Sequence, residues 1–160
     1  HPHSFDVLHY LRGEVRYVHA FLKRSEGRTC WSNASINLKF ENGVIGHLTG
    51  SYDMTVRHPM ERTEIGGTRG RLVLSNVFED LWFYPHDSDE VTHIHNSIFG
   101  GIRDFNDTFR VRIHRFCEQI VNGDSPDEIE GSGWDALRAQ EAIEAAIRSH
   151  QTGQVVEVPS

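Results

Sequence analysis

The chain lacks several features that would place a protein of 160 residues in a specialised class. It has two cysteines, Cys30 and Cys117, which are too few for a disulfide framework or a four-cysteine zinc site. No apolar run approaches the roughly 18 residues that a membrane-spanning helix needs. Basic residues are also scarce: 16 Lys and Arg against 23 Asp and Glu give a net charge of −7, which argues against a nucleic-acid surface. We therefore expect a soluble, cytoplasmic domain that binds neither membranes nor nucleic acids.

The amino-terminal residues lack the basic and apolar regions of a secretion signal, and there is no initiator methionine. The chain opens instead on a helical pattern, with a candidate cap, three apolar residues at helical spacing and a terminating glycine. These are Ser4, Val7, Leu8, Leu11 and Gly13. A natural chain rarely starts two residues before an amphipathic helix, so we expect a fragment whose upstream part is missing.

Strand signals follow this helix. Residues 14–23 are rich in Val, Tyr and Phe, and residues 34–40 alternate between apolar and polar side chains. Asn42-Gly43 then predicts a hairpin turn, because both residue types tolerate a positive φ. Two registers remain open for this hairpin. A two-residue loop places Phe40 beside Ile45, whereas a loop with a glycine bulge pairs Ile36 with Leu48.

The remaining pattern predicts more hairpins, then helices, then a last strand. The short strands are expected at 61–65, 71–74, 81–84 and 91–95, the helices at 104–122 and 134–150, and the last strand at 155–158. Strands gathered in one run with helices at the ends indicate an α+β fold. We expect an open, largely antiparallel (mixed) β-sheet with helices packed on one face. The other face is then available for oligomerisation.

The segment Gly131-Ser132-Gly133-Trp134-Asp135-Ala136 matches the glycine-rich fingerprint of dinucleotide-binding proteins and opens a helix. That fingerprint requires a strand immediately before it. Here an acidic loop, residues 124–130, precedes it and would repel phosphate. We interpret the segment as a helix start built from small residues, and we place no cofactor-binding residue in this chain.

Two histidine pairs have a spacing found in metal sites, His1 with His3 and His93 with His95. On a strand, His93 and His95 would point to one face. A metal site also needs a third and usually a fourth ligand, and the acidic residues of the nearby loop are equally well explained as turn residues. We therefore assign no metal ligands. No spacing typical of a serine or cysteine nucleophile is present.

Five segments, in this order, resemble motifs of the C-terminal domain of the Gfo/Idh/MocA oxidoreductases, the glucose-fructose oxidoreductase and inositol dehydrogenase type. Residues 3–13 look like the family's H-x-x-D…L-x-G helix, and residues 34–50 look like its central hairpin with E-N-G at the turn. Residues 65–72 look like the turn I-x-G-T-x-G-x-L, residues 135–142 like the helix D-x-L-x-A-x-E-A, and residues 152–156 like the closing T-G-x-x-V.

The resemblance implies that residues 1–160 are a C-terminal substrate-binding and oligomerisation domain. The N-terminal Rossmann domain, which binds NAD or NADP, would lie outside this chain. The implied reaction is hydride transfer between that cofactor and a secondary alcohol or carbonyl of a sugar, cyclitol or related polyol. The implied partner is a second copy of the protein, in a dimer or a dimer of dimers formed through the open face of the sheet.

His3 aligns with the family's catalytic histidine, which gives or takes a proton at the substrate oxygen. The Asp that many members place four residues before that histidine would fall upstream of His1. The Lys of the family's E-K-P motif is also absent, since Lys23 and Lys39 are the chain's two lysines and neither precedes a proline. This chain therefore holds at most one residue of the catalytic set, and alone it should not catalyse hydride transfer.

Candidate substrate-binding residues come from the end of the central hairpin and the loop after it. Polar groups there could hydrogen-bond sugar hydroxyls, although loops are polar by default. The candidates are Tyr52, Asp53, Arg57, His58 and Arg62. Two alternatives stay open: a stand-alone, non-catalytic module that dimerises through its sheet, and a metal-dependent binding domain that uses His93 and His95.

Overall fold

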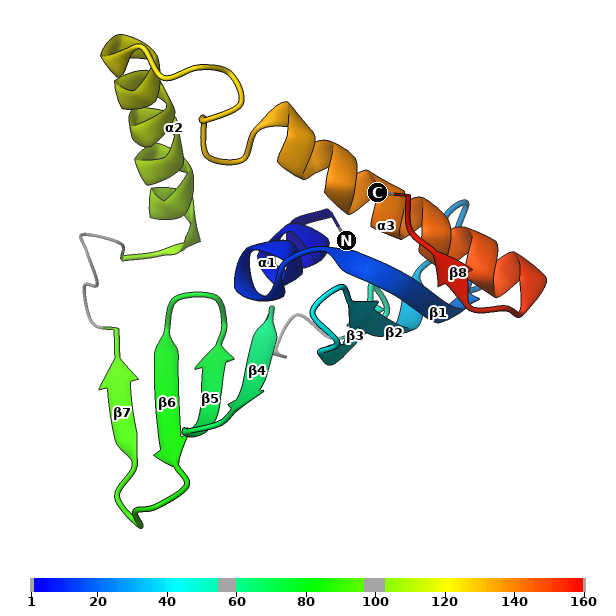
Figure 1. Ribbon diagram of the computed structural model, residues 1–160, viewed down its shortest axis with the longest axis horizontal. Coiled ribbons are helices and arrows are strands. Elements are labelled where there is room, and N and C mark those ends of the chain that lie inside the picture. The colour runs from blue at the N-terminus through cyan, green and yellow to red at the C-terminus, as the bar shows by residue number, and fades with distance from the viewer. Residues whose placement is uncertain (1, 55–59, 97–102, 160) are drawn as a thin grey trace. The chain divides into compact units, whose positions relative to one another are not determined.

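In the computed structural model, residues 2–54, 60–96 and 103–159 are described. The chain divides into two compact units (Figure 1). Unit 1 comprises His1–Met54 and Gln119–Ser160, and unit 2 comprises Thr55–Glu118. Within the described ranges, helices and open antiparallel sheets confirm the predicted α+β class. The strands form two four-stranded sheets, one in each unit, whereas the sequence pattern indicated a single sheet.

Unit 1 contains a sheet with the strand order β3-β2-β1-β8 and two helices. Its elements are α1 (Pro2–Arg12), β1 (Val15–Lys23), β2 (Asn33–Phe40), β3 (Ile45–Ser51), α3 (Gly133–Thr152) and β8 (Val156–Glu157). In the hairpin, Ile36 pairs with Leu48, so the register with the glycine bulge is the correct alternative. Gly43 supplies the positive φ (83°) that this turn requires.

The core of unit 1 lies between this sheet and its helices. Side chains alternate along β1 and β2, and the buried face includes Val18, Ile36 and Phe40. Against it, α3 buries a row of small residues: Ala139, Ala142, Ala145, Ala146 and Ser149. The sequence pattern favoured a stripe of Leu137, Ile143, Ala146 and Ile147, but Leu137 is exposed. Small side chains let α3 lie close to β1, which it contacts directly.

The outer edge of β1 is closed by residues from the carboxyl-terminal part of the chain. The short strand β8 pairs with Tyr17 and Val18. Further along β1, the Ala20 amide donates to the Ser149 hydroxyl (3.0 Å) and the Leu22 amide donates to His150 Nδ1 (3.2 Å). These α3 side chains therefore satisfy strand amides that β8 does not reach.

Several of the five motif segments supply helix caps and turns. Gly13 ends α1 with a positive φ (84°), and the Asn42 side chain donates to the Arg12 carbonyl (2.8 Å). Ser132 caps α3 and exchanges hydrogen bonds with Asp135 in a capping box. At the other end, Gly153 takes a left-handed conformation and donates to the Ser149 carbonyl. These segments thus have a structural role in unit 1.

Unit 2 contains the sheet β4-β5-β6-β7, in which every pairing is antiparallel. Its strands are β4 (Arg62–Gly67), β5 (Gly70–Ser75), β6 (Asp80–Pro85) and β7 (Thr92–His95), and α2 (Phe105–Asn122) begins in this unit and ends in unit 1. Gly70 is tightly enclosed, because a Cβ there would lie 2.3 Å from the Tyr84 carbonyl oxygen. Among the described residues, no helix is long and apolar enough to cross a membrane.

Candidate functional sites

The candidate catalytic residue, His3, lies in the first turn of α1 and is exposed. Two residues later, Phe5 is 1% exposed and belongs to the core, so α1 is fixed to unit 1 close to His3. Further along the helix, α1 contacts α3, and Asn42 caps its last turn. The structure therefore presents His3 to solvent on a firmly anchored helix.

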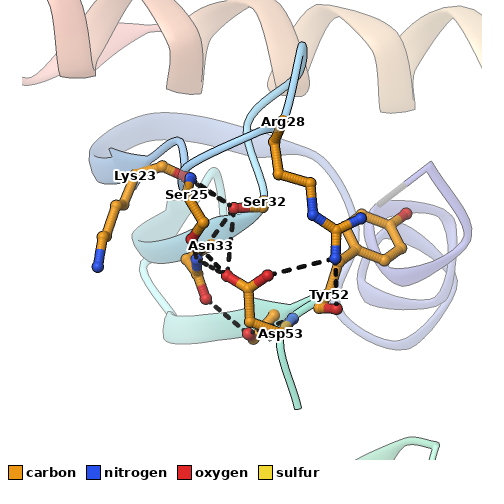
Figure 2. A network of polar contacts seen from close by, with 8 residues as sticks. Lys23, Ser25, Arg28, Ser32, Asn33, Tyr52 and Asp53 are labelled. Carbon is orange, nitrogen blue, oxygen red and sulfur yellow. Dashed lines mark hydrogen bonds and ion pairs between the residues drawn. The ribbon is translucent and has the colours of Figure 1, made fainter.

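The candidate substrate residue Asp53 lies at the centre of a polar network in unit 1 (Figure 2). Its Oδ2 accepts hydrogen bonds from the Ser25 hydroxyl (2.5 Å) and the Asn33 amide (2.6 Å). Its Oδ1 lies 3.3 Å from Arg28 Nη2. The Asp53 amide in turn donates to the Ser51 hydroxyl (3.0 Å). This carboxylate thus joins the loop after β1 to the ends of β2 and β3.

These donors favour the ionised form of the carboxylate. Hydrogen bonds from Ser25 and then Asn33 lower the pKa of Asp53 below its ordinary value, and the nearby Arg28 acts in the same direction. A substrate hydroxyl would have to compete with these groups for the same oxygens. The geometry therefore gives Asp53 a role in holding the loop, whether or not it also contacts a ligand.

Tyr52 adjoins this network, and its side chain is 62% exposed. Its amide donates to the Ser32 carbonyl (2.8 Å), and its carbonyl accepts from Arg28 (3.2 Å). The structure thus fixes the backbone of Tyr52 and leaves much of its side chain exposed. Of the other candidates, Arg57 and His58 lie outside the described residues. Arg62 starts β4 in unit 2, where it pairs with Glu64 at 3.3 Å.

A second cluster lies on β6 and β7 in unit 2. Asp80 Oδ1 is 2.7 Å from His93 Nε2 and 2.8 Å from His95 Nδ1. The two imidazoles lower the pKa of Asp80, His95 more than His93. Sequence reasoning found the two histidines but missed Asp80, which is distant in sequence. The signal that points to it is strand register, because Asp80 pairs with His95 across the hairpin.

A cavity of about 440 Å³ lies in the same unit, beside the turn between β5 and β6. Its lining includes Asn76, Val77, Glu79, His95 and Arg103. Asn76 and Val77 both have positive φ values (52° and 67°), which is unusual for a β-branched residue such as Val77. The cavity therefore adjoins both the histidine cluster and a turn with an uncommon backbone conformation.

In the glycine-rich segment that opens α3, the side chain of Asp135 occupies the N-terminus of the helix. The Asp135 carboxylate accepts from the Ser132 amide (2.7 Å) and the Ser132 hydroxyl (3.0 Å). A negative group thus already lies at the helix N-terminus, where a phosphate would have to bind. This geometry supports the interpretation of the segment as a helix start.

Comparison with known proteins agrees with the predicted resemblance. Residues 1–73 match the family model described as the GFO/IDH/MocA C-terminal domain. This match confirms the resemblance over α1, the strands β1–β4 and the first part of β5, up to Val73. No curated protein matches the sequence.

Solved structures extend the likeness in fold to almost the whole chain. Levoglucosan dehydrogenase in complex with NADH and levoglucosan has a TM-score of 0.88 and 19% identity, over 99% of this chain and 49% of that one. An oxidoreductase from Agrobacterium radiobacter in complex with NAD⁺, L-tartaric acid and magnesium has a TM-score of 0.82 and 22% identity, over 98% of this chain and 47% of that one. An oxidoreductase domain protein from Kribbella flavida has a TM-score of 0.86 and 20% identity, over 99% of this chain and 48% of that one.

At these identities the likeness defines the fold, which is that of a domain found in NAD-binding oxidoreductases. The chain spans about half the length of the structures that it matches.

Proposed function

We propose that this chain is the substrate-binding and oligomerisation domain of an NAD(P)-dependent oxidoreductase. The complete enzyme would oxidise a secondary alcohol of a sugar, cyclitol or related polyol, or reduce the corresponding carbonyl. The observation that carries the proposal is the family match over residues 1–73. The neighbours that bind NAD(H), with a fold shared over nearly the whole chain, support the same assignment.

The cofactor would be held by a domain outside this chain and would exchange a hydride with the substrate carbon. In the oxidation direction, the alcohol carbon would give up its hydrogen together with the C–H electron pair, as a hydride, to the nicotinamide that the cofactor domain supplies. The hydroxyl proton must then go to a base. We assign that base to His3, because imidazole suits proton transfer near neutral pH and His3 is exposed on the anchored helix α1.

Substrate hydroxyls would be recognised near the end of β3, where the structure leaves the Tyr52 side chain exposed. Arg57 and His58 follow in sequence, and Arg62 lies beyond them in unit 2. Asp53 would contribute mainly by holding the loop before β2 in place, a role that its hydrogen bonds to Ser25, Asn33 and Ser51 support. We propose Tyr52 as the first substrate-binding position to test.

The catalytic assignment is tested in the protein that carries this chain together with its cofactor domain. NADH formation is followed at 340 nm with a panel of sugars and cyclitols, using NAD⁺ and NADP⁺ in parallel. His3→Asn should lower kcat by about 10²- to 10⁴-fold, the usual contribution of a general base, and leave the Kd for NADH nearly unchanged. The matched control is His114→Asn, which removes an exposed histidine on α2.

An unchanged kcat in His3→Asn would remove His3 from the catalytic set but leave the oxidoreductase assignment standing. Absence of NADH and NADPH formation with every substrate of the panel would instead favour the non-catalytic module. The two results therefore separate the role of His3 from the function of the whole protein.

We further propose that a second copy of the chain covers the sheet face of unit 1 opposite its helices. That face exposes Phe21 (64%) and Ile45 (80%), beside polar side chains such as His47 and Asn37. Sedimentation equilibrium of the full chain should show a dimer or tetramer. Phe21→Lys combined with Ile45→Lys should shift it to monomer, and a monomeric unmodified chain would contradict the proposal.

A further inference from the structure

The hairpin of β6 and β7 places three groups with metal-binding chemistry on one face. His93 and His95 are two residues apart on β7 and therefore point to the same side. Across the hairpin, His95 pairs with Asp80 and His93 pairs with Trp82. One potential ligand atom from each of Asp80, His93 and His95 lies within 4.8 Å of the other two. Strand register thus supplies the third ligand that the sequence spacing alone did not reveal.

We propose that Asp80, His93 and His95 bind a zinc-type divalent cation. Two imidazole nitrogens and one carboxylate oxygen are ligands suited to zinc and other transition metals, whereas Mg²⁺ and Ca²⁺ prefer sites made of oxygen atoms. Three protein ligands leave a position of a tetrahedral ion for water. The site goes beyond the proposed hydride transfer, because none of its residues belongs to the candidate catalytic or substrate set.

The distances require only a small adjustment to admit the ion. Donor atoms around a tetrahedral zinc, each about 2.0–2.2 Å from the metal, lie roughly 3.4 Å apart. The two imidazole nitrogens are now 2.7 and 2.8 Å from the Asp80 oxygen, at hydrogen-bonding distance. Exposed imidazoles, 45% for His93 and 65% for His95, can rotate outward to open this space. The metal would then replace the two hydrogen bonds to the carboxylate.

Trp82 orients one of the ligands. Its ring lies parallel to that of His93, with an interplanar angle of 4° and a centroid separation of 4.7 Å. Outer groups that fix a ligand ring commonly strengthen metal binding. Trp82 also provides a signal, because a cation at His93 would change the environment of the stacked indole and therefore its fluorescence.

The ion would act as a cross-link between β6 and β7. All four residues of β7 are exposed, so apolar burial contributes little to keeping this edge strand in the sheet. Asp80 comes from β6 and the two histidines come from β7, so one ion would tie the strands together. The predicted consequence is slower hydrogen exchange of the β7 amides when Zn²⁺ is bound.

Calorimetric titration of ZnCl₂ into the full chain, purified without a histidine tag and stripped with EDTA, tests the proposal. We expect one Zn²⁺ per chain at this site, no heat of binding with MgCl₂ and a change in tryptophan emission. Asp80→Asn keeps the shape of the side chain, and His95→Gln changes a largely exposed residue. Each should weaken binding by about tenfold or more, since even the loss of an outer-shell partner costs 10- to 100-fold.

His114→Gln is the matched control. His114 Nδ1 also lies beside a carboxylate oxygen, that of Glu118 at 3.3 Å, but this pair is not part of a three-residue cluster among the described residues. The control should bind Zn²⁺ like the unmodified chain. Absence of stoichiometric Zn²⁺ would overturn the proposal. So would binding that both Asp80→Asn and His95→Gln leave unchanged, because the zinc would then be held by other histidines.

Discussion

Unit 1 and unit 2 each contain a four-stranded antiparallel sheet, but they bury very different amounts of apolar surface. Twelve of the thirteen buried hydrophobic side chains among the described residues belong to unit 1, where α1 and α3 cover the sheet. The thirteenth buried hydrophobic side chain, Val73, belongs to unit 2. The same strand architecture is therefore stabilised by a helix-covered core in one unit and by other interactions in the other.

The interactions within unit 2 lie mostly on or near the surface of its sheet. Arg71 bonds to Glu64 at 2.8 Å and lies over the ring of Tyr84. Trp82 stacks on His93, and Gly70 allows two backbone segments to approach closely. Surface ion pairs contribute little each, so unit 2 depends strongly on backbone pairing and close packing at a few positions. Substitutions in the two units should therefore act through different mechanisms.

The largest effect is expected in the core of unit 1. Phe40→Ala removes a side chain that is 2% exposed and leaves a cavity between β2 and the helices, which should lower the free energy of unfolding by about 3–5 kcal/mol. Urea denaturation followed by circular dichroism measures this loss. Tyr10→Ala on α1 of the same unit is the control, since Tyr10 is 89% exposed. Equal losses in the two variants would contradict the burial pattern described for unit 1.

The next effect should appear in unit 2 and come from the backbone. Gly70→Ala would place a Cβ 2.3 Å from the Tyr84 carbonyl oxygen, so β5 and β6 would have to shift apart. We expect a loss of about 2–4 kcal/mol and faster hydrogen exchange in both strands. At Gly66, on β4, an added Cβ meets no atom within 4 Å. Gly66→Ala should therefore retain the exchange rates of the unmodified chain, and similar behaviour of the two variants would refute the packing argument.

The smallest effect concerns the loop network of unit 1 and depends on pH. Hydrogen bonds lower the pKa of Asp53 in the folded chain below its ordinary value of 3.8. The ionised carboxylate therefore stabilises the fold when the pH is above that ordinary pKa. This contribution is lost as the pH falls below that value and the folded-state group is protonated. When the pH is lowered from 7 to 3, the free energy of unfolding of Asp53→Asn should therefore fall by less than that of the unmodified chain.

Urea unfolding at the two pH values measures that difference. Asp127→Asn, which removes an exposed carboxylate from the loop before α3, serves as the control and should follow the unmodified chain. If Asp53→Asn also follows the unmodified chain, the network around Asp53 does not hold its carboxylate in the ionised form.

Local patterns predicted much of this fold. Alternation located β2, helical spacing located α2 and α3, and Asn42-Gly43 located a turn whose bulged register was one of two alternatives. The buried face of α3 was predicted in part: Ala146 is buried and Ile143 packs against the core, but Leu137 is exposed, because close packing on β1 favours alanine over the larger side chain. The division into two sheets is a tertiary property for which the strand pattern carries no signal.

The candidate sites show the same limit. The histidines of β7 were found by their spacing, but Asp80 becomes their neighbour only through the β6–β7 register. Asp53 was expected to face a ligand because it lies in a polar segment. Its bonds to Ser25 and Asn33 depend on how the loop after β1 returns to β2, which residue types alone do not determine. The role of His3 remains a prediction.

The closure of the β1 edge by Ser149, His150 and β8 has a consequence for truncation and aggregation. A polypeptide cut before Ser149 would keep the strands β1–β3 but lose the acceptors for the Ala20 and Leu22 amides. It would also lose the strand that pairs with Tyr17 and Val18. The bared edge could then recruit a strand from another molecule. The residues from Ser149 onward thus protect the sheet of unit 1 from self-association. Proteolysis near the carboxyl terminus would remove that protection.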